Sequence, residues 1–331
     1  MRIPLLPRVA ALALPVVVLA GCAPATTPSA TSNAEPSAAA SAVIDNCGFE
    51  VQVPAEPPRR IVTIKSTSTE LLLALGLGDR IVGQAFPDGP VPDEWADEAA
   101  SIPTISEFAP SEEAVLDLEP DFVFGGWESN FAADTAGERD ELASLGIGTY
   151  VSPAACKEPG YMPDPLTSDL LFDFIDEAGR LFGAADAAQA LVAEQRRQLA
   201  SVTPDDRGLT ALWWSSGEDV PYVGAGLGAP QLMLDALGLT NVAGEVRDTW
   251  TPMGWEAIAD ANPDLIVLVD ASWNTAESKI AALEADPVLS QLDAVTHERY
   301  LRIPFPAAEA GARTVPAIVD LSEQLAALDL D

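Results

Sequence analysis

The chain has 331 residues, with 51 acidic and 17 basic side chains, a formal net charge of −34 and a single histidine. A surface this acidic repels nucleic acid and anionic lipid headgroups, so both are excluded as partners. His297 alone cannot supply the several imidazoles of a zinc or manganese site. The sequence therefore predicts no metal site and no resident cofactor.

Residues 1–21 predict an export signal. Two arginines precede an apolar run, 9–20, which is too short to span a bilayer comfortably, and Leu19-Ala20-Gly21-Cys22 follows it. This ending resembles a lipobox, which implies that Cys22 is acylated and that lipid alone holds the protein at the outer face of the cytoplasmic membrane. An ordinary export signal with a chance cysteine is the alternative. Residues 22–43 are rich in Ala, Ser, Thr and Pro, and we expect a disordered tether.

The chain contains three cysteines. If Cys22 carries lipid, Cys47 and Cys156 form an even pair in an oxidising compartment, and we expect a disulfide between them. Two free thiols are the alternative.

Residues 44–165 alternate between strand and helix patterns. Short β-rich runs predict strands at 60–64, 80–83, 121–124 and 149–151, and helical spacing of apolar residues predicts helices at 69–77, 112–118 and 139–145. Strands that alternate with helices predict a parallel sheet covered on both faces.

Residues 166–203 are predicted to be helical, and the alternation restarts after them. One helix begins near Thr167, a plausible N-cap, and a second at 185–200 is expected to connect two lobes. The later pattern predicts strands at 209–214, 265–269 and 300–303 and helices at 230–237, 254–261 and 279–283. The predicted fold is α/β, with lobes at 44–165 and 204–331 that contain parallel-type sheets flanked by helices and are joined by one long connecting helix.

The two halves share an internal repeat. Residues 113–123, EAVLDLEPDFV, match residues 256–266, EAIADANPDLI, and residues 74–77 match 236–239 in the same order. The spacing between the matched segments differs in the two halves, which indicates a duplicated lobe and not a solenoid.

These segments resemble the periplasmic binding proteins that serve importers of ferric siderophores, haem and cobalamin. The resemblance is carried by residues 59–64, 74–79, 118–121 and 262–264 and extends from about residue 57 to near the C-terminus. It implies a monomeric protein that binds a small molecule between its lobes and delivers it to the permease and ATPase of an ABC importer.

The resemblance also assigns a docking role to Glu113 and Glu256. In that family one exposed glutamate on each lobe contacts arginines of the permease, and these two positions match. Simple stabilisation of a helix N-terminus by a carboxylate is the alternative for either residue.

A narrower resemblance concerns residues 46–49, 126–131, 155–161 and 222–226. These segments are similar to an actinobacterial branch proposed to bind a phosphorylated deazaflavin coenzyme precursor. A ferric siderophore and a deazaflavin both remain open as ligands.

In parallel α/β lobes, ligands bind beyond the carboxyl ends of the strands, and the loops there are unusually aromatic. We expect a flat ligand to stack on these rings, and Lys65, Arg247 and Arg313 to bind an anionic group on it. Core packing and surface ion pairing are the alternatives for individual residues. The predicted ligand-binding residues are Lys65, Ser66, Thr67, Phe86, Trp127, Tyr161, Trp214, Tyr222, Arg247, Trp250, Trp273, Phe305 and Arg313.

An exported enzyme and a purely structural lipoprotein are the rival interpretations. The sequence has no nucleophile elbow and no P-loop, and the glycines at 224–228 lack the spacing of a dinucleotide-binding loop. We therefore predict a binding protein that is not an enzyme.

Overall fold

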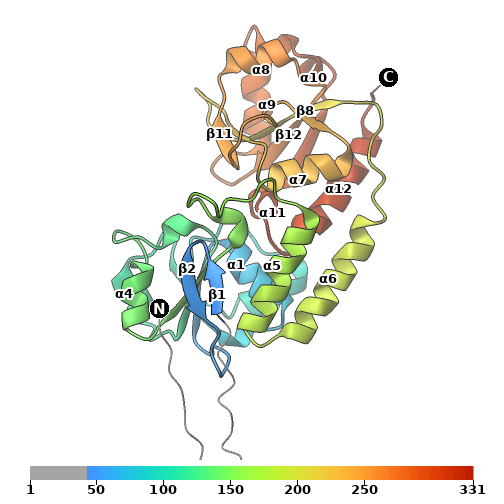
Figure 1. Ribbon diagram of the computed structural model, residues 1–331. Coiled ribbons are helices and arrows are strands. Elements are labelled where there is room, and N and C mark those ends of the chain that lie inside the picture. The colour runs from blue at the N-terminus through green and yellow to red at the C-terminus, as the bar shows by residue number, and fades with distance from the viewer. Residues whose placement is uncertain (1–42, 331) are drawn as a thin grey trace, which may run out of the picture. The chain divides into compact units, whose positions relative to one another are not determined.

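The computed structural model describes residues 43–330 (Figure 1). The predicted signal, Cys22 and all of the predicted tether except residue 43 lie outside this range. Within residues 43–330, no helix is both long and apolar enough to cross a membrane.

The N-terminal lobe contains a five-stranded sheet in the order β5-β4-β3-β6-β7, and every neighbouring pair is parallel. A separate antiparallel hairpin precedes it, formed by β1 (Val43–Asn46) and β2 (Phe49–Gln52). The sheet strands are β3 (Ile61–Ile64), β4 (Ile81–Ala85), β5 (Thr104–Ser106), β6 (Phe122–Gly125) and β7 (Gly148–Val151). The helices of this lobe are α1 (Ser66–Ala74), α2 (Ala96–Ala99), α3 (Glu112–Leu116) and α4 (Arg139–Ser144), with short 3-10 turns at Gly78–Arg80, Asp93–Trp95, Glu128–Asn130 and Pro153–Ala155.

Two consecutive helices follow, α5 (Ser168–Leu181) and α6 (Ala185–Leu199). Thr167 caps α5 through its side chain, which accepts a hydrogen bond from the Leu170 amide at 3.3 Å. The chain then passes from α6 into the first strand of the C-terminal lobe (Figure 1).

The C-terminal lobe has a mixed sheet in the order β11-β9-β8-β12-β13, with β10 also paired to β8. Its strands are β8 (Thr210–Ser216), β9 (Tyr222–Gly224), β10 (Thr240–Asn241), β11 (Trp250–Pro252), β12 (Leu265–Asp270) and β13 (Tyr300–Pro304). The helices are α7 (Ala229–Leu237), α8 (Trp255–Ala261), α9 (Ala276–Ala285), α10 (Asp293–Thr296), α11 (Phe305–Ala308) and α12 (Thr314–Ala327), and a 3-10 turn spans Leu289–Gln291.

The α/β prediction is confirmed, with one correction in this second sheet. Strands β8, β10, β12 and β13 are parallel, but β9 runs antiparallel to both β8 and β11. The reason is the short loop between β8 and β9, because a few residues can join antiparallel strands whereas a parallel pair needs a long crossover.

One apolar cluster is shared by the two sheets. Alternate residues of each central strand point to opposite faces, so that Ile61 and Trp213 enter the shared cluster. Val62 and Trp214 enter separate clusters on the other face of their own sheets. Helices α5, α6 and α12 contribute side chains to the shared cluster as well. The lobes are therefore joined by common packing as well as by the chain.

The sequence repeat corresponds to a repeated structural device. Asp121 accepts hydrogen bonds from the backbone amides of Arg59 and Arg60 at 2.8 and 3.0 Å. Asp264, its counterpart, accepts from the amide and hydroxyl of Thr210 at 2.7 and 2.8 Å. In the N-terminal lobe this aspartate links the start of β3 to the start of β6, and in the C-terminal lobe it links the start of β8 to the start of β12.

Candidate functional site: an aromatic cavity between the lobes

A cavity of about 900 Å³ lies at the carboxyl ends of the strands of both sheets. Its volume is within the range of small-molecule sites, and its position is the one expected for a ligand site in α/β lobes. The N-terminal lobe contributes the loops after β6 and β7. The C-terminal lobe contributes the end of β8, the first residues of β9 and β11, the loop after β12 and the starts of α7 and α11.

Six of the predicted ligand-binding residues line this cavity. They are Thr67, Trp127, Tyr222, Trp250, Trp273 and Phe305. The rings of Tyr222 and Trp250 are stacked with centroids 6.3 Å apart, and those of Trp273 and Phe305 meet edge to face at 5.7 Å. Trp273 is 62% exposed, and an exposed large ring at a cavity is available to a ligand.

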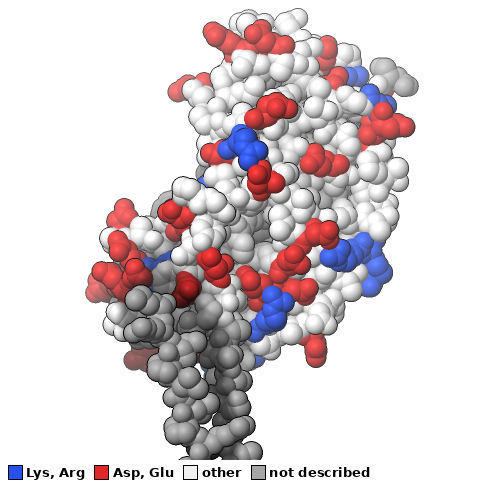
Figure 2. All heavy atoms as spheres, in the orientation of Figure 1, with Lys and Arg blue, Asp and Glu red and all other residues white. Residues whose placement is uncertain are grey.

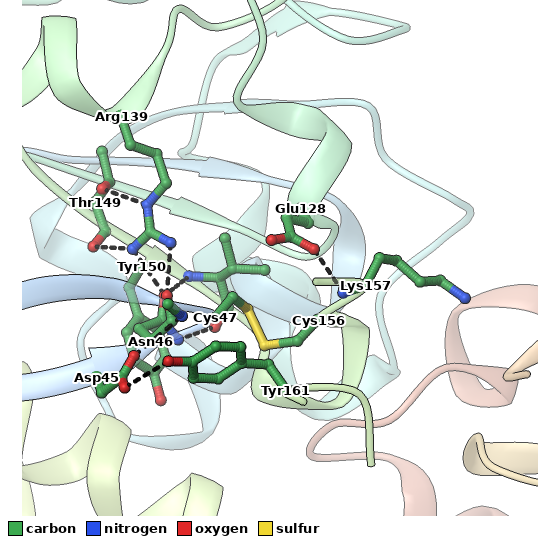
Figure 3. The surroundings of a disulfide bond; sticks show 12 residues. Asp45, Asn46, Cys47, Glu128, Arg139, Thr149, Tyr150, Cys156, Lys157 and Tyr161 are labelled. Carbon is green, nitrogen blue, oxygen red and sulfur yellow. Dashed lines mark hydrogen bonds between the residues drawn. A yellow bond between two sulfur atoms is a disulfide. The ribbon is translucent and has the colours of Figure 1, made fainter. Parts of the chain in front are cut away.

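The first hairpin forms one wall of the cavity through Phe49. Arg139, at the start of α4, stacks its guanidinium 4.3 Å from the Phe49 ring and donates to the carbonyl and side-chain oxygens of Asn46 at 2.8 and 2.9 Å. A disulfide between Cys47 and Cys156 holds the same hairpin to the loop after β7 (Figure 3). The pairing thus joins the two cysteines that the sequence singled out.

Lys157, next to this disulfide, connects the two lobes across the cavity. Its ammonium group lies 2.6 Å from the Asp248 carboxylate and 2.6 Å from the Thr249 hydroxyl. Figure 3 shows the side chain extended away from the disulfide. Both partners are about half exposed, at 47% and 44%, so the pair stabilises the fold only slightly.

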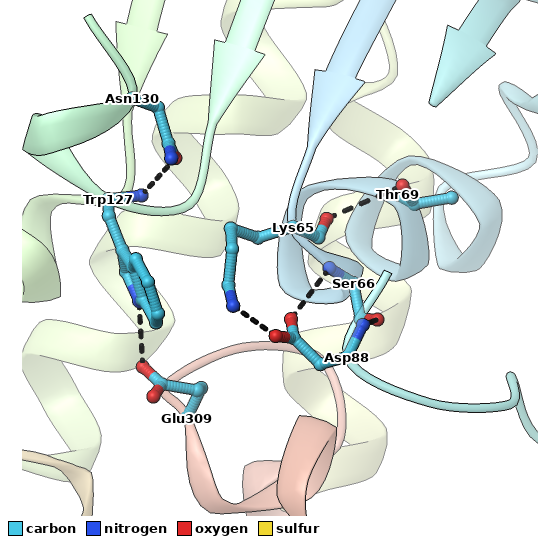
Figure 4. A network of polar contacts seen from close by, with 7 residues as sticks. All are labelled: Lys65, Ser66, Thr69, Asp88, Trp127, Asn130 and Glu309. Carbon is cyan, nitrogen blue, oxygen red and sulfur yellow. Dashed lines mark hydrogen bonds and ion pairs between the residues drawn. The ribbon is translucent and has the colours of Figure 1, made fainter. Parts of the chain in front are cut away.

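Lys65 does not line the cavity. The side chain is 1% exposed and forms an ion pair with Asp88 beside the Trp127 ring (Figure 4). Its ammonium lies 3.6 Å from the ring centroid of Trp127 and 4.1 Å from that of Phe86. Burial lowers the pKa of Lys65 and raises the pKa of Asp88, and the attraction between the two opposes both shifts. The ammonium therefore stabilises the packing behind Trp127 and does not contact the cavity.

The backbone around Lys65 is strained and tightly packed. Lys65 has φ 80° and ψ 147°, and Phe86 has φ 52°, which are costly conformations for residues with a Cβ. Gly126 lies against this segment, and a Cβ there would meet the Lys65 Cβ at 2.7 Å. The strained backbone is kept in place by the Lys65–Asp88 ion pair, by the packing of Lys65 against the Phe86 and Trp127 rings, and by the close approach of Gly126.

The other predicted residues also lie outside the cavity lining. Ser66 accepts a hydrogen bond from the Asp88 amide at 2.8 Å, Phe86 packs behind Trp127, and Tyr161 donates to Asp45 at 2.9 Å. Arg247 pairs with Asp164 at 2.6 Å, and Arg313 pairs with Glu70 at 3.2 Å.

Trp214 requires the clearest correction. It is fully buried and packs against Trp255 at 4.9 Å between ring centroids, because β8 is covered by helices on both faces. The three cations proposed to bind an anion are all paired with carboxylates, and none of them lines the cavity.

Sequence reasoning missed the residue that reaches Trp127 from the C-terminal lobe. Glu309 follows α11, and its carboxylate accepts a long hydrogen bond from the Trp127 indole at 3.4 Å (Figure 4). Burial raises the pKa of Glu309, and the positive charge of Lys65 partly opposes that shift. Glu309 stands alone among small apolar residues in the sequence, so no pattern marked it.

Other lining residues that the prediction did not name have common features. Several are polar side chains of loops and helix starts whose roles depend on tertiary contacts, including Glu128, Arg139, Lys157, Ser215, Ser216 and Thr249. The scarcity of lysine could have drawn attention to Lys157. Within residues 43–330, no group of three or more His, Cys, Asp or Glu side chains is arranged to hold a metal ion.

A family model described as periplasmic binding protein matches residues 61–307, which span both sheets and the cavity between them. The chain belongs to this family. Among the relatives of this periplasmic binding protein is an uncharacterised ABC transporter substrate-binding lipoprotein, YvrC, from Bacillus subtilis, which is 26% identical over 96% of this chain and 95% of its own. A vitamin B12-binding protein of Yersinia pestis is 25% identical over 65% of this chain and 71% of its own.

Solved structures show the same fold. An ABC-type Fe3+-hydroxamate transport system protein from Saccharomonospora viridis is 26% identical, with a TM-score of 0.72 over 86% of this periplasmic binding protein and 99% of that chain. A periplasmic binding protein from Veillonella parvula has a TM-score of 0.75 at 24% identity, with 86% and 96% covered.

Proposed function

We propose that this protein is the extracytoplasmic substrate-binding component of an ABC importer and binds an iron-siderophore-like metal chelate between its lobes. The observation that carries the proposal is the aromatic cavity, which is built from the strand ends of both sheets in a chain of this family. The relatives described as serving vitamin B12 and ferric hydroxamate transport support the same class of ligand. None of the relatives named above is described as binding a deazaflavin, so that precursor enters only as a competing ligand in the test.

Intrinsic fluorescence tests ligand binding, because Trp127, Trp250 and Trp273 line the cavity. We expect saturable quenching when the soluble chain, beginning after Cys22, is titrated with a ferric hydroxamate. Haem, cobalamin and a phosphorylated deazaflavin are the comparison ligands. Replacing Trp273 by Ala should weaken binding. The control Trp255→Phe should not, because Trp255 is a partly buried residue that packs against Trp214 and does not line the cavity. Quenching by the deazaflavin alone would reject the chelate assignment.

Delivery to a permease is proposed for Glu113 and Glu256. Each is the second residue of its helix, α3 or α8, and both side chains are exposed. Neither makes an ion pair within the described part of the chain. Charge pairs across an interface can couple by about 1.5 to 7 kcal/mol, so exposed glutamates on both lobes suit docking on basic residues of a permease.

Uptake measured in cells with the cognate permease tests this role. The double variant Glu113→Gln/Glu256→Gln should bind ligand normally but lose most transport. Glu112→Gln and Asp260→Asn, on the same two helices, serve as matched controls. Full transport by the double variant would contradict the docking role.

Attachment to the membrane surface is proposed for Cys22. The name of YvrC as a lipoprotein and the lipobox-like sequence support it. A Cys22→Ser variant should be released into the medium by a cell that retains the wild type, as measured by fractionation.

A further inference from the structure

The charged side chains that line the cavity are predominantly acidic. The lining includes five acidic residues and two basic ones, Arg139 and Lys157. The acidic residues are Glu128, Glu138, Asp140, Glu158 and Glu309. Acidic side chains outnumber basic ones in the whole chain, 51 to 17, and on the face shown in Figure 2, so what distinguishes the cavity is which of its charged groups are already paired.

Both basic groups are already engaged by the protein. The Arg139 guanidinium donates to Asn46 and to the Thr149 hydroxyl at 3.0 Å, besides covering the Phe49 ring. The Lys157 ammonium contacts the Asp248 carboxylate. An anionic ligand would have to compete with these contacts for both groups.

The carboxylates are less committed. Glu138, Asp140, Glu158 and Glu309 make no ion pair within residues 43–330. The hydrogen bond that the Glu309 carboxylate accepts from the Trp127 indole is long, and burial raises the pKa of Glu309 although the positive charges of Lys65 and Lys157 partly oppose that shift. A cation placed beside it would relieve that penalty.

The nearby rings favour the same sign of charge. Trp127 already holds the Lys65 ammonium over its ring, and Trp127, Trp273 and Phe305 all line the cavity. The faces of aromatic rings attract cations, and the effect is strongest for Trp.

One feature of the lining favours an anion. Helix α7 begins at the cavity with Gly228 and Ala229. The end of a helix carries roughly half an elementary charge, and its effect fades within one turn. It is outweighed by the excess of carboxylates over basic groups.

We propose that the cavity selects a positively charged ligand and that Glu309, beside Trp127, receives its cationic group. The inference rests on the proposed function and specifies the ligand class as a metal chelate with a pendant ammonium. Neutral chelates bind more weakly, and chelates or porphyrins with exposed anionic groups bind least.

A matched set of ligands tests this preference. Ferrioxamine B is a ferric trihydroxamate with a pendant ammonium, and its N-acetylated derivative has the same chelate without that charge. Ferric enterobactin, a tris-catecholate, supplies the anionic case. By calorimetry at low ionic strength, ferrioxamine B should bind about tenfold tighter than the acetylated form, or about 1.4 kcal/mol, and the gap should shrink as salt is added.

The Glu309→Gln variant should remove most of that tenfold gap while still binding the acetylated form. Glu323→Gln, an exposed position on α12 away from the cavity, should leave the gap unchanged. Equal or tighter binding of the acetylated chelate or of ferric enterobactin by the wild type would overturn the charge preference but leave a chelate-binding protein. Failure of all three ligands to bind the folded protein would overturn the proposed function as well.

Discussion

The two central strands begin in the same way and end differently. Asp121 and Asp264 hold the start of β3 and β8 through equivalent hydrogen bonds. By the strand registers, the residue that follows β3, Lys65, corresponds to Ser215 near the end of β8. The first is a buried ion-paired lysine, and the second is a neutral side chain that lines the cavity.

This difference separates what the duplication retained from what diverged. The turns and strand starts that build each sheet are repeated, whereas the strand ends that form the cavity are not. The C-terminal lobe adds the antiparallel β9 and β11, which supply Tyr222 and Trp250 to the cavity. The shared scaffold thus positions two unlike walls around one ligand.

The largest expected effect comes from breaking the Lys65 ion pair. Replacing Lys65 by Met leaves Asp88 buried without its counterion and should lower the free energy of unfolding by about 3 to 5 kcal/mol. The corresponding Ser215→Ala should cost less than about 1 kcal/mol. Urea denaturation measures both, and the double variant Lys65→Met/Asp88→Asn should recover part of the loss. Equal stabilities of Lys65→Met and Ser215→Ala would show that the buried ion pair at the end of β3 contributes no more to stability than the neutral side chain at the end of β8.

A pH-dependent difference is expected at Glu70 on α1, whose counterpart by the repeat is the buried Leu232 on α7. Burial raises the pKa of Glu70 to about 7 from an ordinary 4.5, so the folded protein binds more protons between these values. The stability that Glu70 contributes is full below pH 4.5 and is lost as the pH rises through 7.

The Glu70→Gln variant removes this dependence. The unfolding free energy of the variant minus that of the wild type should increase by up to about 3 kcal/mol between pH 4.5 and pH 7. Loss of the Arg313 contact adds an offset that is the same at each pH. Denaturation midpoints across this range measure the trend, and Glu323→Gln is the control. A difference between variant and wild type that does not change with pH would contradict it.

The smallest effects are expected where the lobes are alike. Asp121→Ala and Asp264→Ala should each lower the unfolding free energy by about 1 to 3 kcal/mol. The first leaves two backbone amides without their acceptor, and the second leaves the amide and the hydroxyl of Thr210 without theirs. The Asn substitutions retain one acceptor and should recover part of the loss. If the two losses of unfolding free energy differ several-fold, the two aspartates do not stabilise their lobes equally.

Much of the scaffold could be predicted from the sequence because it depends on local patterns. Buried parallel strands appear as apolar runs, and α5 has both its N-cap Thr167 and its apolar spacing. The C-terminal helix α12 was missed, although Val315, Ile318, Leu321 and Leu325 follow helical spacing. The short hairpin β1–β2 carries too few residues for a clear alternation.

The site was harder to predict because burial depends on what covers a strand end. Trp214 and Trp273 both follow the pattern of an aromatic residue near the end of a strand, yet the first is fully buried and the second is 62% exposed. Lysine is scarce in this chain, and Lys65 directly follows a predicted strand, but its ammonium forms an ion pair with Asp88, 23 residues later. Only the folded chain reveals that partner.

The apolar cluster shared by both sheets has a consequence for the mechanics of capture. Two lobes that bury side chains in one cluster cannot rotate far apart without exposing that cluster to water, and neither half retains a complete core when separated. The cavity is therefore a largely preformed groove with little closure to drive. Heat should therefore melt the whole molecule in a single transition, with both sheets lost together.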